Sequence, residues 1–307
     1  MAPGANASAA STARASAATA LVNGLAGNRT ASQASLLRSA GERGGYDVSG
    51  IVEGKRALVV GVANKRSIAW AIARRLDQEG ARVALTFQGE RVEKDVRKLA
   101  DELSNGPVPV LPLDVTDDAE LDAAVAGTAE ALGGIDILVH AVAFGKVEDL
   151  GGRFMDVSDD GFQLALDISS WSLKRLAARV EPHMREAGGG AIVTMSYVAA
   201  ERAVPGYNVM GIAKSALESI VRYLAWDMGP DNVRVNALSA GPVRTLAARG
   251  IPGFGDMVDN ATERSPLRRP IDADEVADAA LFLCSDLARA VTGETLHVDA
   301  GYHAMAI

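Results

Sequence analysis

Residues 196–214 have the sequence SYVAAERAVPGYNVMGIAK, in which Tyr207 and Lys214 are seven positions apart. Pro205 fits the first turn of a helix, because its missing N–H costs nothing there. On such a helix the Tyr207 and Lys214 side chains lie on one face, about 10 Å apart along the axis. The phenol can then donate a proton or hydrogen bond to a small molecule, while the ammonium binds a sugar hydroxyl and lowers the phenol's pKa. An isolated pair of this kind is more often a packed Tyr and a solvated Lys, so its neighbours matter.

Short apolar runs flank this predicted helix at residues 191–195 and 233–238. A strand, a long helix and a strand indicate a parallel βαβ unit. Further strands are predicted at residues 55–60, 82–87, 108–113, 135–139 and 294–299, and further helices at 67–76 and 272–287. The pattern predicts an α/β fold with a doubly wound parallel sheet of Rossmann type. Functional residues should gather at the carboxyl ends of its strands.

The first strand and helix indicate a nucleotide site. Gly61 allows a tight turn, and Ser67 can cap a helix whose free N–H groups favour a diphosphate. Only one glycine of the three-glycine fingerprint is present, so an ordinary strand-to-helix loop is the alternative. Gln88 follows the second strand and can hydrogen-bond ribose hydroxyls, which favours NADH, although the nearby Arg91 leaves NADPH open. Asp114 and Val115 follow the third strand, at the expected adenine edge.

Together these segments resemble the short-chain dehydrogenase/reductase superfamily and, within it, the bacterial NADH-dependent enoyl-acyl-carrier-protein reductases. The resemblance covers residues 51–307 and is most specific in 196–214 and in 236–247, NALSAGPVRTLA. The superfamily usually has its catalytic Tyr four residues before the Lys, where this chain has Met210. The enoyl reductase branch uses the longer spacing and a second Tyr ten residues earlier, which is Tyr197 here.

The resemblance implies reduction of trans-2-enoyl thioesters on acyl carrier protein by hydride from NADH, the last reductive step of type II fatty acid elongation, without a metal. It implies that Tyr207 contacts the thioester carbonyl and its enolate, that Lys214 holds the nicotinamide ribose, and that Tyr197 borders the acyl pocket and takes part in proton supply. Gly145 stands where the family has a substrate-contacting alanine. The residues implied for the cofactor site, besides Lys214, are Gly61, Ser67, Ile68, Gln88, Asp114, Val115, Val142, Val243, Arg244, Thr245, Leu246 and Ala247.

The chain departs from the family on the substrate side. Ala141 replaces the serine that usually follows the His at the end of strand four, and Lys146 follows Gly145. The segment 251–259, which corresponds to the mobile substrate cover, has two acids and no basic residue. Basic residues elsewhere would then have to steer an acidic carrier protein. The candidates are Arg249, Arg264, Arg268 and Arg269. These arginines are explained equally well as solvated surface residues.

Composition limits the other function classes. The 307 residues are 48% hydrophobic and 23% charged, which is ordinary for a globular protein with a substantial core. A net charge of −8 without a basic stripe argues against a nucleic-acid partner. Cys284 is the only cysteine, lies in an apolar run and is predicted to pack in the core. The four histidines lack metal-ligand spacing, His140 is expected to pack structurally, and no apolar stretch reaches the ~18 residues of a membrane span.

Residues 1–50 are predicted to be a disordered tail. The first 41 residues contain 14 Ala, 9 Ser or Thr and 3 Arg, with no Asp or Glu. This composition offers too little apolar surface to fold, and it also resembles an organellar transit peptide. The alternatives are a plain extension or upstream sequence from a start-site error. Residues 51–307 resemble bacterial proteins, so a cytoplasmic location is favoured over a plastid or other organelle.

Two other functions stay open on this sequence. One is a short-chain carbonyl reductase, or a specialised enoyl reductase with another substrate. The other is a non-catalytic NAD(H)-binding protein, because fold does not fix function. The resemblance also implies a homotetramer that pairs long helices and the last strand. Trp171, Tyr223 and Trp226 lie on the helices concerned, either in that interface or in the intramolecular core.

Overall fold

The computed structural model describes residues 50–251 and 253–306, so the expectations for residues 1–49 of the predicted tail lie outside it. Seven parallel strands form one sheet with the order β3-β2-β1-β4-β5-β6-β7. The reversal of strand order between β1 and β4 is the switch point of a doubly wound sheet, so the predicted fold class is confirmed. The strands are β1 (Arg56–Val60), β2 (Arg82–Phe87), β3 (Val110–Pro112), β4 (Ile137–His140), β5 (Gly190–Ser196), β6 (Val233–Ala240) and β7 (Thr295–Val298).

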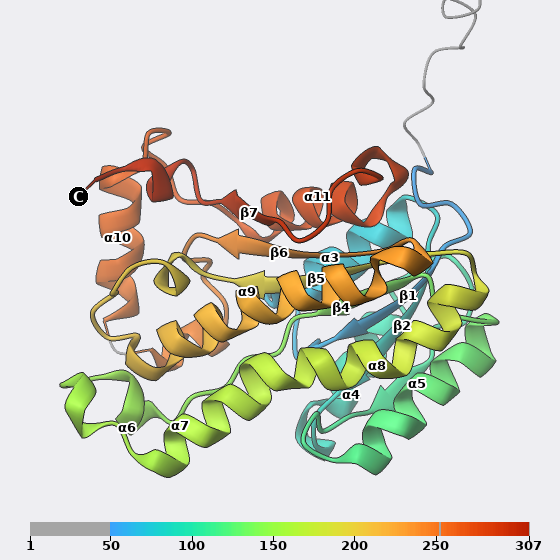
Figure 1. Ribbon diagram of the computed structural model, residues 1–307, viewed down its shortest axis with the longest axis horizontal. Coiled ribbons are helices and arrows are strands. Elements are labelled where there is room, and N and C mark those ends of the chain that lie inside the picture. Colours follow the sequence, from blue (N-terminus) through green and yellow to red (C-terminus); the bar gives the residue numbers. More distant parts are fainter. Residues whose placement is uncertain (1–49, 252, 307) are drawn as a thin grey trace, which may run out of the picture. The chain divides into compact units, whose positions relative to one another are not determined.

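Helices cover both faces of the sheet (Figure 1). One buried cluster joins the sheet to α3 (Ile68–Gln78), α4 (Glu90–Ala100) and α11 (Ala273–Cys284). A second cluster joins it to α5 (Asp118–Leu132), α8 (Ser172–Glu186) and α9 (Asn208–Met228). The sheet therefore lies between two apolar layers, which explains why its strands are continuous apolar runs and do not alternate.

The helix starts follow from local sequence in two cases. Ser67 accepts a hydrogen bond from the Trp70 amide at 3.3 Å, so its predicted capping role is confirmed. Asp272 and Glu275 form a reciprocal capping box that starts α11. Cys284 ends α11 and is buried, as predicted.

The start of α9 differs from the prediction. Gly206 has φ +78°, so the chain turns between Pro205 and the helix, which begins at Asn208. Pro205 is therefore not in its first turn, and Tyr207 immediately precedes the helix. Since φ = −121° at Tyr207 is not helical, its side chain is placed by the turn and not by helical periodicity.

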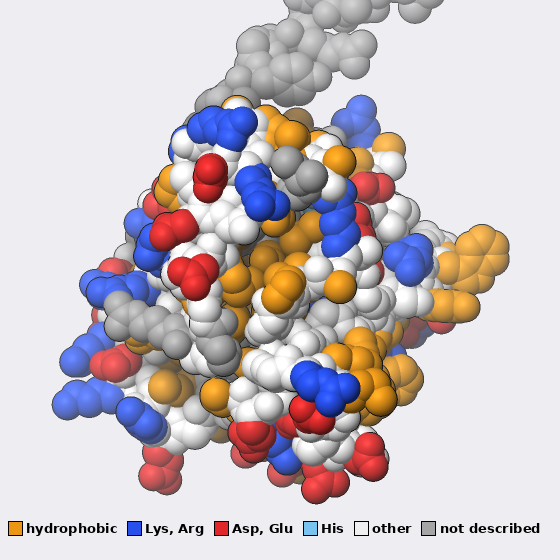
Figure 2. Space-filling model, turned by 90° about the vertical axis from the view of Figure 1, so that its left-hand side faces the viewer, with side chains coloured by type: hydrophobic (Ala, Val, Ile, Leu, Met, Phe, Trp, Pro, Cys, Tyr) orange, Lys and Arg blue, Asp and Glu red, His pale blue; other side chains and the backbone are white. Residues whose placement is uncertain are grey.

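The carboxyl ends of β1, β4, β5 and β6 meet at one end of the molecule (Figure 1). Three short helices lie there: α6 (Val147–Leu150), α7 (Asp159–Leu166) and α10 (Phe254–Arg264). Figure 2 faces this end and shows hydrophobic side chains gathered in a central hollow. The helix α10 comes from the segment expected to cover the substrate.

Three aromatic side chains on the α8–α9 face point to solvent. Trp171 is 48% exposed, Tyr223 72% and Trp226 82%, so the intramolecular-core alternative is wrong for all three. Trp171 ends a π-helical turn, Asp167–Trp171, that joins α7 to α8. No helix within residues 50–251 and 253–306 has the length and apolar character needed to cross a membrane.

Candidate active site

A cavity of about 670 Å³ opens at the carboxyl end of the sheet. Its walls come from the loops after β1, β4, β5 and β6, and from α9 and α10. Of the residues singled out in the sequence, the cavity is lined by Gly61, Ser67, Ile68, Val142, Gly145, Tyr197, Tyr207, Lys214, Val243, Thr245 and Leu246. Parallel topology brings these positions together although they are separated by up to 185 residues in the chain (246 − 61).

Tyr197 and Tyr207 pack edge to face, with ring centroids 4.9 Å apart. Tyr197 follows β5, and the turn at Gly206 presents Tyr207 opposite it. Withdrawal from water raises the pKa of Tyr197 to about 12, and it raises that of Tyr207 as well. The prediction that the ammonium lowers the Tyr207 pKa is therefore wrong, because burial dominates. Both side chains are neutral phenols at ordinary pH and can act as hydrogen-bond donors.

Lys214 is the buried cation of the site. Its side chain is 4% exposed, and Nζ donates to the Met195 carbonyl oxygen at 2.8 Å. Burial lowers the Lys214 pKa to about 8, although the Glu218 carboxylate opposes the shift. The ammonium thus remains mostly charged at neutral pH, and its other donors are available to a ligand in the cavity.

The loop after β1 fits a close-lying phosphate group. Gly61 has φ +104°, and a Cβ there would come within 2.8 Å of the Ala141 carbonyl carbon, so only glycine fits. Ile68 and Ala69 start α3, and their amides have no hydrogen-bond acceptor in the described part of the chain. These donors lie beside the cavity at the positive end of the helix dipole, where a diphosphate is stabilised.

The loop after β4 is fixed by serines of the π-helical turn and by the first residue of α8. Ser169 Oγ accepts from the Phe144 amide at 2.9 Å and donates to its carbonyl at 3.1 Å. Ser172 and Thr194 hydroxyls lie 2.8 Å from the two ring nitrogens of His140. Burial, with the Lys214 charge, lowers the His140 pKa to about 3, so the ring is neutral. The structural role predicted for His140 is confirmed.

Gly145 packs against the apolar wall of the cavity. A Cβ at this position would lie 3.1 Å from Leu150 Cδ2 and 3.1 Å from Met210 Cγ. Glycine therefore lets these two side chains approach the loop more closely than alanine would. Met210, Phe254 and Met257 also line the cavity and were not predicted. Met210 could have been predicted to line the cavity, since it lies one helical turn from Lys214.

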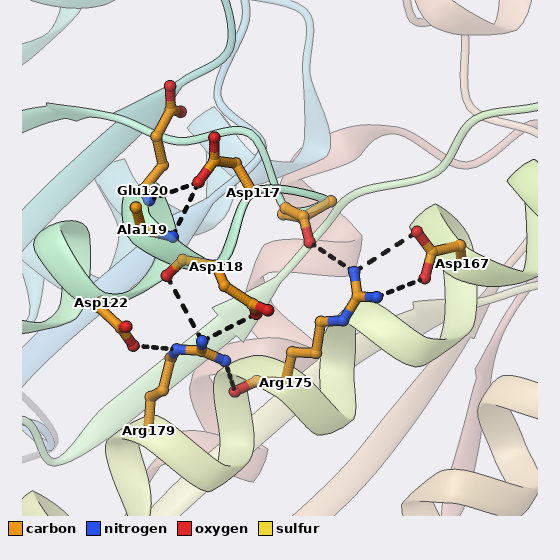
Figure 3. Close-up of polar contacts among 9 residues, drawn as sticks. Asp117, Asp118, Ala119, Glu120, Asp122, Asp167, Arg175 and Arg179 are labelled. Atoms are coloured by element: carbon orange, nitrogen blue, oxygen red, sulfur yellow. Dashed lines mark hydrogen bonds and ion pairs between the residues drawn. The ribbon is translucent and has the colours of Figure 1, made fainter.

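The predicted adenine edge lies beside the cavity and does not line it. Gln88 Nε2 donates to Asp114 Oδ2 at 3.0 Å, which joins the ends of β2 and β3. Arg175 of α8 donates to the Val115 carbonyl at 3.3 Å and forms an ion pair with Asp167 at 2.9 Å (Figure 3). Arg179 binds Asp118 and Asp122 on α5 in the same network. Arg175 thus connects α8 to the backbone at Val115, in the loop after β3.

The remaining predicted residues lie away from the cavity or outside the described side chains. Arg244 is exposed and lies 3.8 Å from Asp259 of α10. The side chains of Ala247 and Arg249 are not among those the structure describes. Arg264, Arg268 and Arg269 are all exposed, and Arg269 is paired with Glu275 at 2.6 Å.

Comparison with known proteins agrees with this geometry. The family described as enoyl-(acyl carrier protein) reductase matches residues 61–303. The chain belongs to this family. This family lies within the short-chain dehydrogenase/reductase superfamily, as the sequence resemblance implied.

Two relatives and one solved structure illustrate the similarity. The chain is 48% identical over 252 residues to the NADH-dependent enoyl-[acyl-carrier-protein] reductase of Bacillus subtilis, covering 82% of this chain and 97% of that protein. It is 46% identical to the NADPH-dependent enzyme of Staphylococcus aureus, covering 83% and 98%. The Bacillus cereus reductase, crystallised with NADP⁺ and an indole naphthyridinone, superimposes with a TM-score of 0.81 at 49% identity, covering 84% and 99%.

Proposed function

We propose that this protein reduces the trans-2 double bond of enoyl thioesters on acyl carrier protein with NADH, through a reductase unit formed by residues 51–307. The strongest support is that Tyr197, Tyr207 and Lys214 converge on one cavity whose other walls are mainly apolar. An acyl chain needs the apolar walls, and the developing thioester oxyanion needs a donor. Both relatives named above are enoyl-[acyl-carrier-protein] reductases by name, and the Bacillus subtilis protein is named for NADH.

The residues present fit a dinucleotide. The glycine cradle at Gly61 and the free amides of α3 would hold the diphosphate, and Lys214 would hold the nicotinamide ribose. Gln88, already bound to Asp114, would meet the adenosine ribose. A neutral amide offers no cation for a 2′-phosphate, which supports NADH over NADPH. When bound, NADH supplies the hydride that the β-carbon receives.

The side chains of the site perform the remaining chemistry. Tyr207, kept neutral by its raised pKa, donates a hydrogen bond to the thioester oxygen as negative charge collects there. The nearby Lys214 ammonium stabilises the same charge. Tyr197 packs against the Tyr207 ring, limits its movement and borders the acyl chain. The α-carbon then takes a proton, and we assign Tyr197 a part in supplying it, since its hydroxyl group belongs to the same cavity.

The decisive assay follows absorbance at 340 nm with crotonyl thioester and either NADH or NADPH. We expect consumption with NADH and slower consumption with NADPH. Faster consumption with NADPH would overturn the argument from Gln88. Consumption with ketones and not with crotonyl thioester would indicate a carbonyl reductase. Tight NADH binding without turnover of any of these substrates would indicate a binding protein.

We also propose that the protein meets the carrier in the cytoplasm. Arg264 and Arg268, exposed near the end of α10, remain candidates for steering an acidic carrier. Arg269 is the weaker candidate, because Glu275 already neutralises it.

A homotetramer is the assembly that this family resemblance supports. The exposed Trp171, Tyr223 and Trp226 give the α8–α9 face an aromatic surface of the kind enriched at protein interfaces. We expect light scattering to give four times the chain mass of 31.9 kDa, and Trp226→Glu to reduce it. A monomeric wild-type protein at micromolar concentration would contradict the assignment.

A further inference from the structure

Glu218 is a buried carboxylate that the proposed mechanism does not use. It lies on α9 one turn after Lys214 and is only 8% exposed. A carboxylate in such a position is destabilising unless it has partners, because burial removes it from water. Its surroundings therefore indicate what it does.

Glu218 and Lys214 contact consecutive residues at the end of β5. Ser196 Oγ donates to Glu218 Oε1 at 2.5 Å, and Lys214 Nζ donates to the Met195 carbonyl at 2.8 Å. Ser196 and Tyr197 both line the cavity, and they are adjacent in the chain. The two α9 side chains thus hold the strand end that presents Tyr197.

The charges that act on Glu218 come from three elements. Arg222 lies on α9 itself, Glu201 follows η3 (Val198–Ala200), and His297 belongs to β7. Glu218 in turn acts on Lys214, one turn earlier on α9, and raises its pKa. Glu201 and His297 are already paired with each other at 3.0 Å. Burial raises the Glu218 pKa, while the Ser196 hydrogen bond opposes this shift. Lys214 is therefore the cation of the cavity whose charge Glu218 most directly affects.

We propose that Glu218 is a positioning residue of the reductase, which anchors the Ser196 hydroxyl beside Tyr197 and balances the Lys214 ammonium that faces the cavity. The expected effect of Glu218 on turnover rests on the proposed function. The effect of Glu218 on Lys214 can be measured through NADH binding alone, without any enoyl substrate.

The expected pH dependence of NADH affinity follows from the sign of the charge interaction between Glu218 and Lys214. Lys214, with a pKa of about 8, is charged below that pH and loses its proton as the pH rises through it. An ionised Glu218 raises this pKa, so removing its charge moves the loss of the ammonium to lower pH. Because Glu218 lies four residues after Lys214 on α9, the two side chains are on the same face of the helix, where neighbouring charges interact.

The test measures NADH affinity by fluorescence titration between pH 6 and pH 9, together with turnover of crotonyl thioester. In Glu218→Gln, whose amide oxygen still accepts from Ser196, we expect the pH at which affinity is half lost to fall measurably below the wild-type value. Glu218→Asp keeps the charge and should restore the wild-type midpoint. Glu130→Gln, which removes an exposed carboxylate on α5, serves as the control.

Ser196→Ala separates the two parts of the inference. It keeps the Glu218 carboxyl group and removes only the Ser196 hydrogen bond, so the fall in the midpoint for NADH should be smaller than in Glu218→Gln, while turnover falls about three- to tenfold, as the loss of one hydrogen bond predicts. An unchanged midpoint in Glu218→Gln, with thermal melting that shows a folded protein, would overturn the charge-balancing role. A shifted midpoint in a protein that turns over no enoyl thioester would instead refute the proposed function and leave this interaction established.

Discussion

Tyr207→Phe is expected to lower turnover of an enoyl thioester by about 10²–10⁴-fold while NADH affinity stays within about twofold of wild type. The substitution removes only the hydroxyl, so the edge-to-face packing against Tyr197 remains. What is lost is a neutral donor directed at the oxyanion, because burial keeps the phenol protonated. Stopped-flow measurement of NADH oxidation gives the rate, and fluorescence titration gives the affinity.

Tyr223→Phe is the matched control, since Tyr223 lies on the outer face of α9 and is 72% exposed. It should keep wild-type turnover. If Tyr207→Phe also turned over crotonyl thioester at the wild-type rate, Tyr207 would have no part in the chemistry. The hydroxyl of Tyr197 would then be the next one to remove.

Lys214→Met is expected to weaken NADH binding about 10- to 100-fold and to reduce turnover as well. Methionine retains most of the buried aliphatic volume and removes the charge, so the effect reports the ammonium. A hydrogen bond to a charged group contributes about 1.5–3 kcal/mol, which corresponds to this range of affinities. Isothermal titration calorimetry at pH 7 measures it.

Lys98→Met provides the comparison, because Lys98 is an exposed lysine of α4 remote from the cavity. It should bind NADH like the wild type. Normal affinity in Lys214→Met would exclude the ribose-binding role and restrict Lys214 to holding the Met195 carbonyl.

The inner strands were predictable because they are largely buried between the two helical layers. Short apolar runs such as residues 233–238 therefore stand out, and their carboxyl ends give the location of the site. The boundary of α9 was not predictable from spacing, since it depends on φ at Gly206. Glycine allows a positive φ but does not require one, so the sequence alone does not reveal the turn.

The polar cavity positions could be predicted better than the apolar ones. Gly61, Tyr197 and Lys214 have chemistry that makes them recognisable at strand ends and on a helix. Phe254 and Met257 line the cavity because α10 folds over it; the resemblance placed their segment at the substrate, but the side chains that face the cavity are seen only in the structure. Glu218 was not singled out in the sequence, and its role emerges only from its burial and its contact with Ser196.

The buried thiol at the end of α11 makes the protein convenient for single-site labelling. Cys284 is 4% exposed, and burial raises its pKa to about 12, so thiolate-directed reagents meet almost no reactive form. It is also the only cysteine in the chain. A cysteine introduced on an outer position of α10 would therefore be the sole reactive thiol. A fluorophore attached there would report how that helix moves over the cavity, without first removing a native side chain.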